Sequence, residues 1–336
     1  MIMTKKILEL IRETSSSLPD DVLKALKAAL RKEAKGSSAA VVLKTILDNC
    51  AIAKKRGTPL CQDTGTLTFF VDERLRRKVT PNVLKKAVAL ATAKGYLRKN
   101  TIDSITGKSY DDNVTEGAPV IHYVDRSSDF RSSSSSGTSS PTVTLVMKGG
   151  GSENMSRQYS LPDSTLGAGR DLAGVRKCLL DAVQKIQGYG CAPGILGVCI
   201  GGDRATGFEV AKEQLLRPLD ANEELGIKNE ELRKLEKRIL KEANTLGIGP
   251  MGLGGKTTLL GVKIASRPRV PASFFVPAHS YSYPPLIVRP REAFNAPNKL
   301  VPVDDCIGEI SSAATASPSD RLVAAASMTG RSFAAR

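Results

Sequence analysis

Tryptophan is absent from this sequence, and aromatic residues make up only 4% of it. Proteins that bind single-stranded nucleic acid stack its bases on aromatic rings, so this chain has little material for such a surface. No apolar run approaches the roughly 18 residues that a membrane-spanning helix needs. The first residues, MIMTKKILELIRE, predict a short amphipathic helix rather than a secretory signal. We therefore expect a cytoplasmic protein without a membrane segment.

Cysteine pairs with CxxC spacing are also missing. The six cysteines lie far apart, at positions 50, 61, 178, 191, 199 and 306. In a reducing cytoplasm, such cysteines are core residues, nucleophiles or metal ligands rather than disulfides. Hydrophobic residues at 41% and charged residues at 25% are ordinary for a globular protein, so disorder of the whole chain is excluded.

Basic residues are abundant, and the formal net charge is +15. This charge would suit nucleic acid, an anionic membrane surface or acidic small substrates. Along residues 230–241, however, acids are interleaved with the lysines and arginines. That pattern is typical of a solvated helix face, so we expect no nucleic-acid partner.

Helical and strand patterns alternate along residues 1–276 and predict one mixed α/β domain in which helices cover β-sheets. A serine-rich stretch, 127–141, predicts a mobile hairpin tip within it. Residues 277–336 form an atypical tail rich in Pro, Ser and Ala. The expected strands span residues 66–71, 121–124, 142–147, 195–200 and 259–264, and the expected helices begin near residues 1, 19, 38, 81, 172 and 230.

Three loops beside predicted strands carry the residue types that chemistry needs: CQDTG at 61–65, GGGSEN at 149–154 and GCAP at 190–193. Glycines let a backbone approach a ligand closely, and successive N–H groups suit a carboxylate or phosphate. Each loop alone is equally typical of a tight turn. Cys61 and Cys191 lie on these loops, where thiolates can reach a metal. Cys50, Cys178 and Cys199 fall in apolar patterns that favour the core.

Asp63 lies two residues from Cys61 in the same tight turn. A thiolate-bound metal and a carboxylate can therefore face one pocket, as acid/base chemistry beside a Lewis-acidic iron requires. The alternative role for Asp63 is to cap the turn.

The ordered set CQDTGT, KGGGSEN, GCAP, GVCIGG and NTLGIGPMGLGGKTT resembles the class I fumarase and L(+)-tartrate dehydratase family. The likeness runs over about residues 5–276 and is to the alpha subunit or N-terminal catalytic domain. It implies a 4Fe–4S cluster held by three cysteines, of which Cys61 and Cys191 are two. It also implies that the partner is a beta subunit, in a hetero-oligomer or dimer, and that the substrate is a small dicarboxylate.

The resemblance further assigns roles to single residues. Asp63 becomes the acid that helps the substrate hydroxyl leave as water. Gln62, Arg98 and the backbone N–H of Gly151 become substrate-binding groups, and an arginine fork pairs well with a carboxylate. A surface helix terminus is the alternative role for Arg98. The expected activity is reversible hydration of fumarate to malate. The alternatives are an L(+)-tartrate dehydratase alpha subunit, or a cluster-free basic relic that binds anions or nucleic acid.

The family pattern breaks at the third cluster ligand. Ser282 stands where the third cysteine is expected, and a serine oxygen holds iron far less well than a thiolate. Cys306 is the only other cysteine in the tail. Three explanations stay open: Cys306 substitutes, the cluster is degraded or absent, or the tail is not the family's own sequence because of a reading-frame error.

Overall fold

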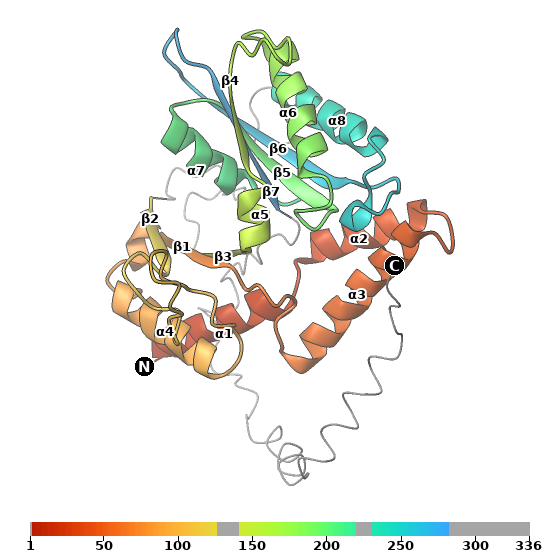
Figure 1. Ribbon diagram of the computed structural model, residues 1–336. Helices are drawn as coiled ribbons and strands as arrows, with labels where there is room; N and C mark the ends of the chain where they lie inside the picture. The colour runs from red at the N-terminus through yellow and green to blue at the C-terminus, as the bar shows by residue number, and fades with distance from the viewer. Residues whose placement is uncertain (1, 126–140, 220–229, 282–336) are drawn as a thin grey trace, which may run out of the picture. The chain divides into compact units, whose positions relative to one another are not determined.

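The structure is a computed structural model that describes residues 2–125, 141–219 and 230–281 (Figure 1). The expected serine-rich loop lies almost entirely outside the described residues. Ser282, Cys306 and the remainder of the predicted tail also lie outside them.

A three-stranded sheet has the order β2-β1-β3, with β1 parallel to β2 and antiparallel to β3. Helix α4 crosses between the two parallel strands, and its first residue is Pro81, whose fixed φ suits a first helical turn. Together α1 and α4 cover one face of this sheet, where Phe69 and Leu145 are fully buried. The elements are α1 (Ile2–Ser16), β1 (Thr66–Asp72), η1 (Glu73–Leu75), α4 (Pro81–Ala93), β2 (Val120–Val124) and β3 (Val143–Lys148).

A four-stranded sheet follows, with the order β4-β7-β5-β6. Strand β7 is antiparallel to both of its neighbours, whereas β5 and β6 run parallel. Strand β5 is buried along its whole length, as expected of a strand that is covered on both faces. The elements of this part are α5 (Gly150–Asn154), β4 (Arg157–Ser160), α6 (Leu172–Ile186), β5 (Gly194–Gly201), α7 (Arg204–Gln214), α8 (Glu230–Thr245), η2 (Pro250–Gly252), β6 (Leu259–Arg267) and β7 (Phe275–Tyr281).

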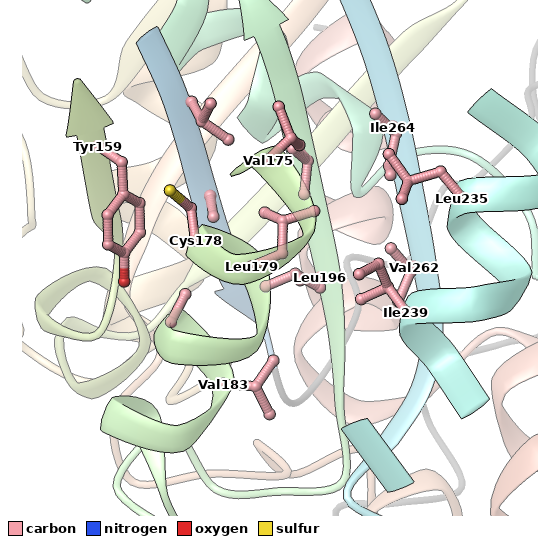
Figure 2. Close-up of a cluster of buried hydrophobic side chains, with 14 of the residues drawn as sticks. Tyr159, Val175, Cys178, Leu179, Val183, Leu196, Leu235, Ile239, Val262 and Ile264 are labelled. Atoms are coloured by element: carbon pink, nitrogen blue, oxygen red, sulfur yellow. The ribbon is translucent and has the colours of Figure 1, made fainter. Parts of the chain in front are cut away.

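Helices cover both faces of the larger sheet. Alternate residues of β5 point to opposite sides: Leu196 and Val198 belong to the cluster under α6 and α8, whereas Cys199 packs with residues of α7. Gly197 lets α7 approach closely, because a Cβ there would lie 2.4 Å from the carbonyl oxygen of Ala211. Figure 2 shows how side chains of α6 and α8 meet those of β5 and β6, among them Val175, Leu179, Val183, Leu196, Leu235, Ile239, Val262 and Ile264.

Helices α2 (Asp20–Lys32) and α3 (Ser38–Arg56) form a pair that packs against Ile195 and Leu215. Acidic residues occupy the first turn of α2, and the Ser37 hydroxyl accepts the Ala40 N–H at the start of α3. Both features stabilise the exposed N–H groups of a helix start. Cys50 lies on the buried face of α3, and Cys178 and Cys199 are fully buried, as their patterns predicted.

The mixed α/β fold and the predicted helices and strands are confirmed. The predicted solvated face on α8 agrees with its ion pairs Lys234–Glu230 and Arg238–Glu242, each four residues apart. Among the described residues, six elements were not predicted: the helices α5 and α7, the strands β4 and β7, and the short 3-10 helices η1 and η2. Strand β7 passes through position 277, so the sheet extends at least five residues into the predicted tail, and the domain boundary stays a prediction. Within the described ranges, no helix is long and apolar enough to cross a membrane.

Candidate functional site

The loop that carries Cys61 and Asp63 lies directly before β1, against the end of β3. Gly65 makes this approach possible. Its φ is +72°, and a Cβ at this position would lie 2.3 Å from the carbonyl carbon and oxygen of Lys148. Only glycine adopts such a conformation without a side-chain clash. The sequence CQDTG therefore places its acidic residue beside the glycine turn that follows Lys148.

Asp63 is the point where three segments meet. Its Oδ1 accepts the Gly65 N–H at 2.9 Å and the side-chain amide of Asn100 at 2.7 Å. Its Oδ2 accepts the Gly150 N–H at 2.7 Å. The Gly65 contact is the turn cap that sequence reasoning offered as the alternative. The other two contacts come from distant parts of the chain, so the carboxylate is fixed in position as well as capping its turn.

The segment that contains Arg98 and Asn100 is held by Asn113. The buried Asn113 side chain accepts the N–H groups of Asn100 and Thr101 and donates to the Arg98 carbonyl and the Thr92 hydroxyl. Its φ of +60° is one that asparagine tolerates better than most residues. Asn113 thus makes four hydrogen bonds and determines where the Asn100 amide meets Asp63.

Cys61 and Cys191 lie near each other. Partial burial raises the pKa of the Cys191 thiol, and the nearby Cys61 and Asp63 raise it further. Such an influence between charges decays with distance, so the three groups share one neighbourhood. Cys191 itself has a φ of +59° and donates its N–H to the Gly188 carbonyl at 3.0 Å. The sulfur of Cys61 accepts the Asp63 N–H at 3.4 Å.

The three predicted substrate-binding residues lie on the Asp63 loop, on the glycine turn, or beside them. Gln62 and Arg98 have exposed side chains, and the Arg98 N–H donates to the Thr64 hydroxyl at 3.2 Å. Gly151 follows Gly150 in α5, and a Cβ there would lie 3.9 Å from the Tyr189 carbonyl oxygen. The glycine turn therefore lies between the Asp63 loop and the turn that carries Cys191.

The sequence did not predict a group of paired charged residues at the glycine turn. Lys148 is 1% exposed, and its ammonium lies 3.1 Å from Glu153 Oε2. Glu153 also pairs with Lys212 of α7 at 2.6 Å. Burial lowers the pKa of Lys148 to about 8, although Glu153 opposes this effect. Burial alone would raise the pKa of Glu153, but the two lysines lower it. The available signal was a lysine that ends an apolar strand just before three glycines.

A complete metal centre is not formed by the described residues alone. Among residues 2–125, 141–219 and 230–281, no group of three or more His, Cys, Asp or Glu side chains could hold a metal ion. Cys61, Asp63 and Cys191 lie close enough to influence one another electrostatically, and the two thiols are of the type that holds an iron–sulfur cluster. The third predicted position, Ser282, and the alternative, Cys306, lie outside the described residues.

Comparison with known proteins agrees with the order of these motifs. The sequence profile of the fumarate hydratase (fumerase) family matches residues 4–280. A protein of Geobacillus stearothermophilus named as a class I fumarate hydratase is 46% identical over 273 residues, which cover 80% of this chain and 50% of that protein. This chain thus spans half the length of that relative.

Two further relatives are named as alpha subunits of L(+)-tartrate dehydratase. The one from Methanocaldococcus jannaschii is 32% identical over 276 residues, covering 79% of this chain and 88% of the relative. The one from Escherichia coli strain K12 is 29% identical over 265 residues, covering 78% and 81%. The profile match spans most of the chain, and the resemblance inferred from its motifs is confirmed: the chain belongs to the fumarate hydratase family.

Proposed function

We propose that this chain is the alpha-type part of an iron–sulfur hydro-lyase that adds water reversibly to fumarate to give malate. The observation that carries the proposal is the Asp63 carboxylate, which the Gly150 N–H and the Asn100 amide hold beside Cys61 and Cys191. A fixed carboxylate next to two thiols is the arrangement that proton transfer beside a Lewis acid requires. Membership of the fumarate hydratase family supports the same reaction.

Cys61 and Cys191 would supply two thiolates to a 4Fe–4S cluster, which when bound acts as a Lewis acid toward the substrate hydroxyl. In the dehydration direction, Asp63 donates a proton to the hydroxyl that leaves as water. In the hydration direction, it accepts that proton back. Arg98 has an exposed guanidinium that would pair with a substrate carboxylate. Gln62 and the Gly151 N–H would orient the same substrate by hydrogen bonds.

A partner is part of this proposal. The chain spans half of its Geobacillus relative, and two other relatives are named as alpha subunits. We infer that a beta-type subunit completes the enzyme in a hetero-oligomer or dimer and contributes the remaining catalytic groups. L(+)-tartrate dehydration is the second candidate, because the relatives whose own length this chain covers most fully carry that name. Malate and tartrate, the hydroxy acids of the two reactions, differ by one hydroxyl.

The test is anaerobic reconstitution of the full chain with iron and sulfide, followed by assembly with a beta-type partner and assays on fumarate and L(+)-tartrate. Asp63→Asn should lower kcat by about 100-fold or more, as loss of a general acid does. Asp112→Asn is the matched control on an exposed acid and should retain activity. A cluster-loaded assembly that turns over neither acid would overturn the proposal. Absent cluster absorbance together with strongly salt-dependent DNA binding would favour the basic relic.

The third ligand position has its own test. Iron per chain is measured after reconstitution for the wild type, Ser282→Cys and Cys306→Ser. If position 282 is the ligand position, Ser282→Cys should raise iron retention, because thiolate binds iron far better than a hydroxyl. If Cys306 substitutes, Cys306→Ser should instead lower iron retention and Ser282→Cys should change little. Cys61→Ser and Cys191→Ser should each lower it in either case.

A further inference from the structure

The glycine turn at 149–154 is tied together at its base by side chains from both of its ends. Lys148 comes just before the turn, Glu153 lies within α5, and Ser156 comes just after it. Lys148 Nζ lies 3.1 Å from Glu153 Oε2 and 3.4 Å from Ser156 Oγ. Because the ammonium is buried, these contacts are shielded from water and constrain the turn strongly. Figure 1 shows α5 between the ends of β3 and β7.

His279 of β7 extends this group of contacts. Its ring is fully buried, with Nδ1 2.7 Å from Ser156 Oγ and Nε2 3.1 Å from the Phe208 carbonyl oxygen of α7. A carbonyl oxygen only accepts hydrogen bonds, so Nε2 carries the hydrogen. Burial lowers the pKa of His279 to about 3, and the Lys148 ammonium contributes to this shift, so the ring is neutral. Nδ1 therefore accepts from the Ser156 hydroxyl.

The donor and the acceptor are now known for each of the three hydrogen bonds that link Lys148 to Phe208. Lys148 donates to Ser156, Ser156 donates to His279, and His279 donates to the Phe208 carbonyl. Chains of this kind polarise one another, and losing a middle member leaves buried polar atoms without their partners. The hydroxyl of Ser156 is that middle member, because it both accepts and donates.

We propose that Ser156 and His279 are positioning residues: by fixing the base of the glycine turn, they hold the Gly150 N–H on the Asp63 carboxylate. The geometric part of this proposal concerns the Gly150–Asp63 contact alone. Its consequence for catalysis rests on the proposed function, in which Asp63 transfers the proton. Neither residue touches Asp63 directly, so both act through the turn.

Threonine and valine at position 156 provide a matched test, because they have the same shape and differ in the hydroxyl. Hydrogen exchange of the Gly150 amide is followed by NMR on ¹⁵N-glycine-labelled full chain, and global stability is measured by urea unfolding. Ser156→Val should raise the Gly150 exchange rate at least tenfold, whereas Ser156→Thr should keep it within threefold. Tyr159→Phe, which removes a hydrogen bond from β4 to Asp181 of α6, should leave the exchange rate of the Gly150 amide unchanged.

Equal exchange rates for the valine and threonine variants would overturn the proposal, as would an increase in Tyr159→Phe as large as that in Ser156→Val. The result of the exchange experiment does not depend on whether the proposed function is correct. If the wild-type assembly turns over neither dicarboxylate but the Gly150 amide responds as expected, positioning stands and the hydro-lyase assignment fails. If the assembly is active and the Gly150 amide does not respond, the reverse holds.

Discussion

The N–H of Gly150 donates to Oδ2 of Asp63 over 2.7 Å, although 87 positions separate the two residues in the sequence. Gly149, the preceding glycine, also lies against Asp63. A Cβ at Gly149 would lie 3.0 Å from the same oxygen. The carboxylate thus lies against the backbone of the glycine turn, and a side chain at Gly149 would be crowded by it. Substitutions that displace the Asp63 loop should therefore also displace the glycine turn, and the reverse.

Gly65→Ala should destabilise the protein by about 3 kcal/mol, the sum expected from a left-handed alanine and from overpacking. The Cβ would lie 2.3 Å from backbone atoms of Lys148, which cannot rotate away as a side chain can. Urea unfolding of the full chain measures this loss.

Gly107→Ala is the matched control, because Gly107 has a similar φ of +69° and nothing within 4 Å of the Cβ position. This variant should lose only the cost of the backbone conformation, about 1 kcal/mol. Equal losses for the two variants would mean that the close approach of Gly65 to Lys148 does not contribute to stability.

Asn113→Asp should destabilise the protein by about 3 kcal/mol. The side chain is 2% exposed, and a carboxylate cannot donate to the Arg98 carbonyl or the Thr92 hydroxyl. Two buried acceptors would lose a donor, and a charge would be placed beside them. Aspartate tolerates the same left-handed backbone, so strain does not complicate the result.

Asp112→Asn, at the exposed neighbouring position, should change the free energy of unfolding by less than about 0.5 kcal/mol. Its Oδ1 accepts the Val114 N–H, which an asparagine oxygen also does. If Asn113→Asp unfolds at the same urea concentration as Asp112→Asn, Asn113 does not hold the segment of Arg98 and Asn100.

Asn100→Asp should lower kcat of the reconstituted assembly by about 100-fold, the usual cost of misplacing a catalytic group. The Asn100 amide donates to Asp63 Oδ1 at 2.7 Å, and a carboxylate there would repel Asp63 instead. Asn100→Ala, which removes the donor without adding charge, should have a smaller effect. Iron content must match the wild type in both variants. An Asn100→Asp assembly as active as the wild type would show that this amide does not position Asp63.

Elements with clear periodicity could be predicted from the sequence. Helix α6 and strand β5 carry apolar residues at the spacing of their structures, and both lie where expected. Strand β7 was missed because its sequence, FVPAHSY, contains a proline and a histidine that are untypical of a central strand. Helix α7 has few apolar positions, since Gly207 and Ala211 are what pack it against β5 and β7.

The candidate site also contains residues that the sequence predicted and residues that it did not. Cys61 and Cys191 could be singled out because they lie on glycine-bearing loops beside predicted strands, and Asp63 because it lies two residues from Cys61. Asn100 and Gly150 could not be linked to Asp63, because their contacts span 37 and 87 positions and leave no periodic pattern. His279 falls in the predicted tail, which was given no fold. Its partners, Ser156 and Phe208, lie 123 and 71 positions away, so the sequence does not link them either.

The buried imidazole should make stability depend on pH between 6.5 and 4.5. The pKa of His279 falls from 6.5 to about 3 on folding, chiefly through burial. Between these values the unfolded chain binds a proton that the folded chain does not, so stability is lost as the pH falls. The loss should be about 2–3 kcal/mol between pH 6.5 and 4.5.

His279→Gln removes this titration while keeping a polar side chain, so the free energies of unfolding of variant and wild type should converge as the pH falls. Three charged groups face the ring: Lys148, Lys212 and Glu153. Lys148 stays charged in this window, because its pKa of about 8 lies above it. The pKa of Glu153 lies below its ordinary value of 4.5, so Glu153 titrates only at lower pH. Urea unfolding at pH 7.0, 5.5 and 4.5 measures the difference. If the stability of variant and wild type changed with pH in parallel, His279 would take up its proton equally in the folded and unfolded states. The neutral ring assigned to His279 in the hydrogen bonds that link Lys148 to Phe208 would then be wrong.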